Sequence, residues 1–174
     1  MSAAEHSLWL LPEPAAQAEL TLLVQSLAPR FGQPAFVPHV TVQGDLAGDL
    51  ATLSGQARAI AAATPPLAWR VDAVETTAHF FRCLVLRFPD TPAFAALQQG
   101  SAVATGTAVG LSPYPHLSLA YGSGMPGMAA LQAEIAAAWQ GRVLRLDRLA
   151  VCRSSKDIPI ADWDCGLTLA LAGG

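Results

Sequence analysis

Two stretches decide how this chain folds: FVPHVTV over residues 36–42 and YPHLSLAY over residues 114–121. In each stretch a proline precedes a histidine, and a hydroxyl residue follows that histidine by two positions. Apolar and polar residues alternate, which is typical of a β-strand that is buried on one face. His39 and Thr41 should therefore share one face of a strand, and His116 and Ser118 one face of another.

The spacing of the two stretches indicates an internal repeat. The histidines lie 116 − 39 = 77 positions apart, and the same offset carries Pro12-Glu13 onto Pro89-Asp90. Such self-similarity is the signature of a duplicated unit. We therefore predict one domain over residues 1–174, built from copies at about 7–76 and 79–152, with a further strand at 165–172.

Each copy is predicted to contain a strand, a helix, a strand, a helix and a strand. Leu20, Val24 and Leu27 recur at helical spacing, for example, whereas the two quoted stretches alternate with a period of two. The expected strands cover 7–11, 35–43 and 67–75 in the first copy and 79–88, 114–121 and 142–152 in the second. The expected helices cover 14–28, 46–63, 92–104 and 126–139.

Composition narrows the class of protein. Hydrophobic residues make up 52% and charged residues 13%, which excludes a disordered chain. No apolar stretch reaches the roughly 18 residues of a membrane helix, and no basic segment leads into an apolar one as in a signal peptide. We expect a cytoplasmic protein without membrane contact. The net charge of −3 argues against a protein that grips long nucleic acid.

The three cysteines, Cys83, Cys152 and Cys165, are odd in number and have no close spacing. The pattern predicts neither a metal knuckle nor a disulfide framework. We expect all three thiols to be buried by packing.

Three kinds of chemistry can use paired histidines and hydroxyls. Zinc would need further ligands, and only Asp45 lies close to the first motif. A serine nucleophile would need a glycine-rich elbow, which neither motif has. Phosphate ester cleavage fits, since histidine titrates near neutral pH and can act as base or acid, while hydroxyls stabilise charge on phosphate oxygens. We predict metal-independent acid–base catalysis without a cofactor, with the roles of His39 and His116 left open.

These paired motifs in a duplicated chain resemble the two-histidine (2H) phosphoesterase superfamily, and within it the cyclic nucleotide phosphodiesterases of the plant and yeast type. The two quoted stretches resemble that group's active-site strands. The string SLWLLP at residues 7–12 resembles its opening strand, and FFRC at 80–83 and LDRLAVC at 146–152 resemble its flanking segments.

The resemblance implies a fold and a reaction. The fold is α+β, with two pseudo-symmetric lobes, each an antiparallel sheet flanked by helices, around a central cleft, as in the LigT-like fold. The reaction is hydrolysis of nucleoside 2′,3′-cyclic phosphates to 2′-phosphates, or of ADP-ribose 1″,2″-cyclic phosphate to ADP-ribose 1″-phosphate. No metal is implied. The disulfides of some plant members have no obvious counterpart here, so redox control is not expected.

The resemblance also implies roles for individual residues. It makes the two motif histidines the catalytic pair and the two motif hydroxyls the phosphate ligands, and it places aromatic side chains on the substrate. The residues are His39 and His116 for catalysis, Thr41 and Ser118 for phosphate binding, and Tyr121, Trp9 and Phe81 for substrate binding. The expected partner is a small nucleotide, and the expected state is a monomer.

Two alternatives stay open. A sister branch acts on RNA 3′ ends as an RNA 2′,3′-cyclic phosphodiesterase or 2′-5′ RNA ligase, but such a protein should carry more arginine than Arg82, Arg87 and Arg153 near the motifs. A non-catalytic nucleotide-binding module is the other, although both motifs are intact. The loop at 153–162, with Lys156, is interpreted as solvated, and His6 and His79 as structural or surface residues.

Overall fold

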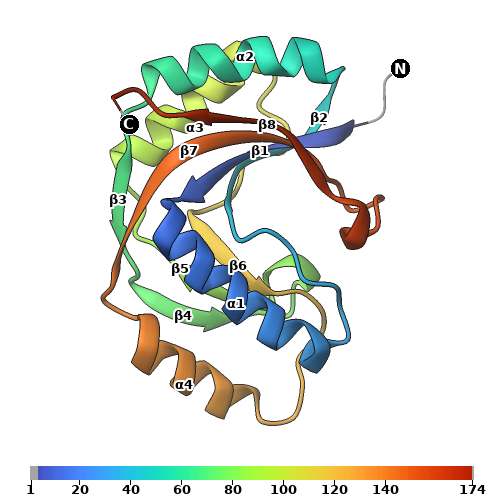
Figure 1. Ribbon diagram of the computed structural model, residues 1–174, viewed down its shortest axis with the longest axis vertical. Coiled ribbons are helices and arrows are strands. Elements are labelled where there is room, and N and C mark those ends of the chain that lie inside the picture. Colours follow the sequence, from blue (N-terminus) through green and yellow to red (C-terminus); the bar gives the residue numbers. More distant parts are fainter. Residues whose placement is uncertain (1–3, 174) are drawn as a thin grey trace.

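The computed structural model describes residues 4–173 and builds them around one antiparallel sheet. Its strands run in the order β3-β7-β1-β2-β6-β5-β4, and β8 lies on β7 outside this path (Figure 1). The α+β class is thereby confirmed. The strands are β1 (Ala4–Pro12), β2 (Val40–Ala47), β3 (Leu67–Arg70), β4 (Ala73–Thr76), β5 (Leu84–Arg87), β6 (His116–Ala120), β7 (Val143–Arg153) and β8 (Asp164–Ala170). The helices are α1 (Pro14–Phe31), α2 (Leu50–Ala63), α3 (Pro92–Thr105) and α4 (Met128–Trp139).

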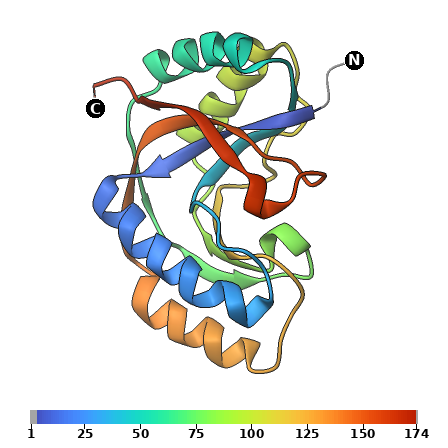
Figure 2. The ribbon, with the colours of Figure 1, turned by 45° about the vertical axis from the view of Figure 1, so that its right-hand side comes forward.

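The two expected lobes meet in the middle of this sheet rather than forming two separate sheets. Strands β2 and β6 share a single register pair, Val40 with Leu117, which are the central apolar residues of the two motifs. Beyond that pair the strands diverge. Helices α2 and α3 cover one end of the molecule, and α1 and α4 cover the other (Figures 1 and 2).

Each half of the chain contributes a strand and a helix that pack against the other half. Strand β7 pairs with β1, and β4 pairs with β5, so the last strand of each half lies beside the first strand of the other. Helix α1 packs on β6, and α3 packs on β2. This reciprocity supports the internal duplication, which we propose as the origin of the fold.

Most elements follow from local sequence. Helix α1 starts with Pro14 in its first turn and buries Leu20, Val24 and Leu27 on one face. It ends at Gly32, whose φ of 63° lies in the left-handed region that glycine adopts easily. Helix α2 starts later than expected because Asp49 caps it, accepting a hydrogen bond of 2.7 Å from the Thr52 amide.

Two predicted strands are divided in the structure. The strand expected at 67–75 breaks at Val71 and Asp72, because β3 pairs with β7 while β4 pairs with β5 at the other end of the sheet. The strand expected at 79–88 begins with the 3-10 turn η1 (Phe80–Arg82), where the His79 ring accepts a hydrogen bond from the Phe81 amide. Local alternation cannot reveal the break at Val71 and Asp72, since it depends on which strands lie alongside.

The prediction that the cysteines form no disulfide is wrong. Cys152 and Cys165 are bonded to each other, and Cys83 is free and buried. The two bonded residues are register partners in β7 and β8. Their separation of 13 positions gave no signal, because the sequence does not show that the two strands pair. The bond closes the loop at residues 153–164.

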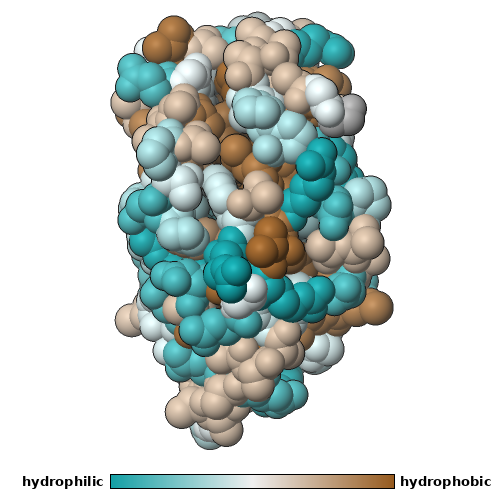
Figure 3. All heavy atoms as spheres, turned by 90° about the vertical axis from the view of Figure 1, so that its left-hand side faces the viewer, coloured by the Kyte–Doolittle hydropathy of each residue, from teal (hydrophilic) through white to brown (hydrophobic). Residues whose placement is uncertain are grey.

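The surface carries scattered apolar side chains. Figure 3 shows one face, on which hydrophilic and hydrophobic residues are mixed without one large apolar area. Isolated exposed apolar side chains are normal for a folded protein. Within residues 4–173, no helix combines the length and apolar character needed to cross a bilayer.

Candidate active site

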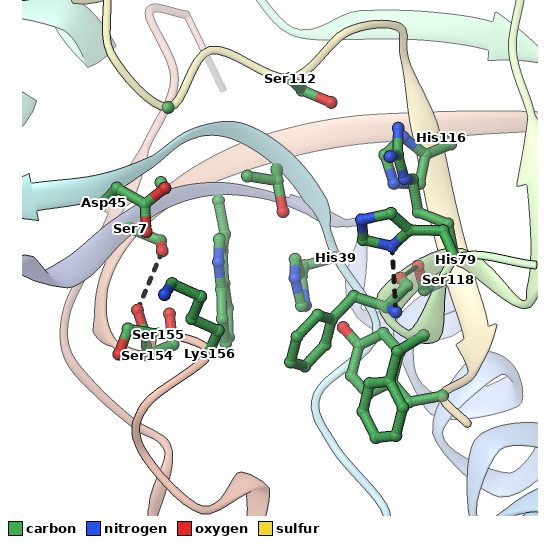
Figure 4. Close-up of a pocket in the computed structure, with 18 of the residues that line it drawn as sticks. Ser7, His39, Asp45, His79, Ser112, His116, Ser118, Ser154, Ser155 and Lys156 are labelled. Atoms are coloured by element: carbon green, nitrogen blue, oxygen red, sulfur yellow. Dashed lines mark hydrogen bonds between the residues drawn. The ribbon is translucent and has the colours of Figure 1, made fainter. Parts of the chain in front are cut away.

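The two motifs meet at one cavity of about 560 Å³, a size that suits a nucleotide-sized ligand. It lies where β2 and β6 diverge. All seven residues singled out by the sequence line it, namely His39, His116, Thr41, Ser118, Tyr121, Trp9 and Phe81. Figure 4 shows that His39 and His116 project into the same space from opposite strands.

A backbone carbonyl fixes each imidazole. The Nδ1 of His39 lies 2.6 Å from the Val37 carbonyl oxygen, and the Nδ1 of His116 lies 2.9 Å from that of Tyr114. In both motifs the proline between these residues has a fixed φ, which helps to hold the carbonyl two positions before the ring. Nδ1 therefore carries the proton and donates it, and Nε2 stays free to exchange a proton with a ligand.

Both imidazoles are neutral in the free protein. Burial, with a smaller contribution from the nearby His116, lowers the pKa of His39 to about 3, although the Val37 hydrogen bond acts in the opposite direction. Burial also lowers the pKa of His116 to about 4, with Arg82 and Arg87 adding to the effect. The sequence predicted histidines that titrate near neutral pH. A bound anion would favour uptake of a proton from solvent by one of the rings, since negative charge nearby raises the pKa of an imidazole.

The two motif hydroxyls have different surroundings. Thr41 is half-buried at the cavity wall. Ser118 is buried, and its hydroxyl donates a hydrogen bond of 2.9 Å to the Phe81 carbonyl oxygen. A phosphate that accepts from Ser118 must therefore displace this bond. Ser118 thus links the cavity to the turn that carries Phe81.

The aromatic residues form a connected wall. Trp9 is only 3% exposed and stacks on His39, with ring centroids 3.6 Å apart and planes 7° apart. One face of Trp9 is therefore occupied by the imidazole, which the indole holds in place. Tyr121 is buried and stacks on Phe36 at 3.9 Å. Phe81 is half-buried and has more freedom to meet a ligand.

Sequence reasoning missed several residues of the cavity. Trp163 was not considered, yet it lies 6.1 Å from Phe81 with the ring planes only 26° apart. His79 is exposed, as predicted for a surface residue, but it lines the cavity. The loop interpreted as solvated places Lys156 there too. Other lining residues that had not been assigned to the site are Ser7, Asp45, Arg82, Ser112, Ser154 and Ser155.

Little in the sequence could have found these residues. The 153–164 loop joins the site only because β7 runs beside β1, which places it across the cavity from the second motif. An aromatic and a lysine in a short polar loop are a weak signal at best. Among residues 4–173, no cluster of three or more histidine, cysteine or acidic side chains is arranged to hold a metal ion.

Comparisons with known proteins identify a family, a relative and proteins that share the fold. The family model described as the 2′-5′ RNA ligase superfamily matches residues 12–158. The cyclic phosphodiesterase of Arabidopsis thaliana is 29% identical over 170 residues, covering 91% of each chain. Escherichia coli LigT, crystallised with phosphate, superposes with a TM-score of 0.60 at 13% identity over 99% of both chains. A protein of Thermus thermophilus gives a TM-score of 0.64 at 14% identity, covering 97% of this chain and 98% of its own. The last two show a shared fold.

Proposed function

This chain belongs to the 2′-5′ RNA ligase superfamily of two-histidine phosphoesterases, and from that premise we propose that it is a metal-independent cyclic phosphodiesterase. Its substrates are nucleoside 2′,3′-cyclic phosphates, opened to 2′-phosphates, or ADP-ribose 1″,2″-cyclic phosphate. The observation that carries the proposal is the pair of imidazoles that face one cavity with Nδ1 tied to a carbonyl and Nε2 free. The name of the Arabidopsis relative supports the same reaction.

The geometry supports in-line hydrolysis. A cyclic phosphate between the two Nε2 atoms brings a negative charge that raises both imidazole pKa values, so that one ring takes up a proton. The neutral ring removes a proton from water as the water oxygen bonds to phosphorus. The bond from phosphorus to the 3′ oxygen breaks, and the protonated ring donates its proton to that oxygen. The 2′-phosphate is left, and the two rings have exchanged protonation states.

Other groups stabilise the charge that develops on the phosphate. The hydroxyls of Thr41 and Ser118 donate to non-bridging oxygens, and the Arg82 guanidinium lies near enough to His116 to act on its pKa. Trp9, stacked on His39, holds that ring in place. Phe81 and Trp163 offer flat surfaces to a base.

The proposal is tested by turnover of 2′,3′-cyclic AMP in the presence of EDTA, with the products separated by chromatography. We expect 2′-AMP and no dependence on added metal. Absence of turnover by correctly folded protein would contradict the proposed function. Loss of turnover on chelation, restored by a divalent ion, would contradict the metal-independent mechanism.

The motif hydroxyls should matter, but less than the histidines. Thr41→Ala is expected to lower kcat/KM by about 10-fold, since one hydrogen bond to a charged oxygen is lost. Ser118→Ala should lower it more, because the Phe81 carbonyl also loses its partner. Steady-state kinetics compares both with Ser26→Ala, an exposed serine on α1. Our division of roles is wrong if either hydroxyl variant is as damaged as the histidine variants.

Action on RNA ends is the second candidate, and the description of the matching family favours it. The net charge of −3 opposes binding of a long strand. A small cyclic nucleotide and an RNA 3′ end can be distinguished by whether the cavity also binds the part of the substrate next to the cyclic phosphate nucleotide.

A further inference from the structure

The cavity continues beyond the residues that the mechanism uses. Figure 4 shows Ser7, Asp45, Ser154, Ser155 and Lys156 gathered at one end, with His116, His79 and Ser118 at the other and His39 between them. All of them line the same cavity. We call the group of Ser7, Asp45, Ser154, Ser155 and Lys156 the distal subsite. It comes from β1, β2 and the loop after β7.

Ser154 has a buried hydroxyl that nothing in the described part of the protein satisfies. Its backbone is well held, since its amide donates to the Glu5 carbonyl at 2.7 Å and its carbonyl accepts from the Ser7 hydroxyl at 3.2 Å. The residue is 3% exposed, yet its Oγ has no hydrogen-bond partner within residues 4–173. An unpaired buried hydroxyl costs free energy. Because Ser154 also lines the cavity, a turn of its side chain would offer this hydroxyl to a ligand there.

Lys156 is the only lysine in the 174-residue sequence. Its ammonium lies 3.7 Å from the carboxylate of Asp157, and both side chains are exposed to water, so this ion pair is weak. Of the residues that line the cavity, Arg82 and Lys156 carry positive charge. Arg82 lies close to His116, with its guanidinium carbon 5.4 Å from the Tyr114 ring centre, whereas Lys156 lies at the opposite end. One cavity thus offers two separated cationic positions.

Asp45 brings an acceptor to the same end. Its φ of 51° lies in the left-handed region, a conformation that costs energy for residues other than glycine and recurs at ligand sites. The neighbouring chain is packed closely, since a Cβ on Gly110 would come into severe collision with the Gly44 carbonyl. The Asp45 carboxylate repels an anion but accepts hydrogen bonds from sugar hydroxyls.

We propose that the distal subsite binds a second phosphate group of the substrate together with its adjoining ribose. The Lys156 ammonium and the hydroxyls of Ser154 and Ser155 bind the phosphate oxygens, and Asp45 accepts from a ribose hydroxyl. This inference rests on the proposed function, because it places the cyclic phosphate between the histidines. Two sources share the required chemistry, namely the diphosphate of an ADP-ribose cyclic phosphate and the phosphodiester that precedes a cyclic 3′ end of RNA.

The test compares three substrates: 2′,3′-cyclic AMP, ADP-ribose 1″,2″-cyclic phosphate, and a dinucleotide that ends in a 2′,3′-cyclic phosphate. Lys156→Ala is expected to lower kcat/KM for a two-phosphate substrate, relative to 2′,3′-cyclic AMP, by about 10-fold. The substrate whose ratio falls identifies the source of the phosphate. Ser154→Ala should lower the same ratio, and its Tm should stay the same or rise because the lost hydroxyl made no bond within the described residues.

Arg153→Ala is the matched control. Arg153 is an exposed cation three positions before Lys156. It pairs with Glu5 and does not line the cavity, so its replacement should leave both ratios unchanged. If the Lys156 and Ser154 variants leave both ratios at the wild-type value while 2′,3′-cyclic AMP is hydrolysed, the distal subsite is refuted and the proposed function stands. If Arg153→Ala lowers the ratios as much as Lys156→Ala, the effect is one of general charge, and the subsite is refuted as well. If no cyclic phosphate is hydrolysed, both proposals fail.

Discussion

Replacement of either motif histidine by alanine is expected to reduce kcat by about 100- to 10,000-fold, the usual contribution of a general acid or base. The cavity supports this large effect. Each residue is more than nine-tenths buried and presents a free Nε2 to the shared space. Single-turnover assays with 2′,3′-cyclic AMP measure the loss.

The two losses should not multiply. Because His39 and His116 act in one concerted step, the double variant is expected to be little slower than the worse single variant. His6→Ala is the matched control. His6 lies on β1, and burial is the main cause that lowers its pKa, but it does not line the cavity. It should keep activity within about twofold of the wild type. A loss below tenfold in His39→Ala or His116→Ala would refute the acid–base assignment.

Local pattern predicted much of this fold because most elements form from neighbouring residues. The buried stripe of α1 and the alternation in the two motifs are visible in the sequence. The pairing of strands is not. Residues 67–75 look like one strand, but its first part pairs with β7, which arrives from far along the chain, while its second part pairs with the nearby β5 at the other end of the sheet.

The candidate site also contains residues that local pattern predicts and residues that only long-range pairing brings to it. Two repeated motifs identified the residues that face each other across β2 and β6, since alternation fixes the face on which a side chain lies. Among the residues that the motifs could not indicate, Trp163 and Lys156 belong to the segment after β7, part of which the Cys152–Cys165 bond closes into a loop. Their place at the cavity is a consequence of β1 pairing with β7, a contact between residues more than a hundred positions apart.

The pH profile of kcat/KM, which reports the free enzyme, should differ from that of kcat, which reports the complex with substrate. In the free protein the pKa values of His39 and His116 are lowered to about 3 and about 4, chiefly by burial. One ring must be protonated to act as the acid. Because kcat/KM reports the free enzyme, it should fall with rising pH above about 4 to 5, by roughly tenfold per pH unit at the limiting slope. The substrate phosphate stays singly charged throughout this range.

The complex should behave differently, because the bound phosphate raises the pKa of the ring that holds the proton. We therefore expect kcat to stay level to a higher pH than kcat/KM, so that KM rises with pH. Initial rates between pH 4 and 9 at constant ionic strength give both profiles. Arg82 lowers the pKa of His116, so Arg82→Gln should move the falling limb of kcat/KM to higher pH even where it reduces the rate. A kcat/KM that rises up to pH 8 would show that neither ring has to gain a proton when substrate binds, and the mechanism would then need a different acid.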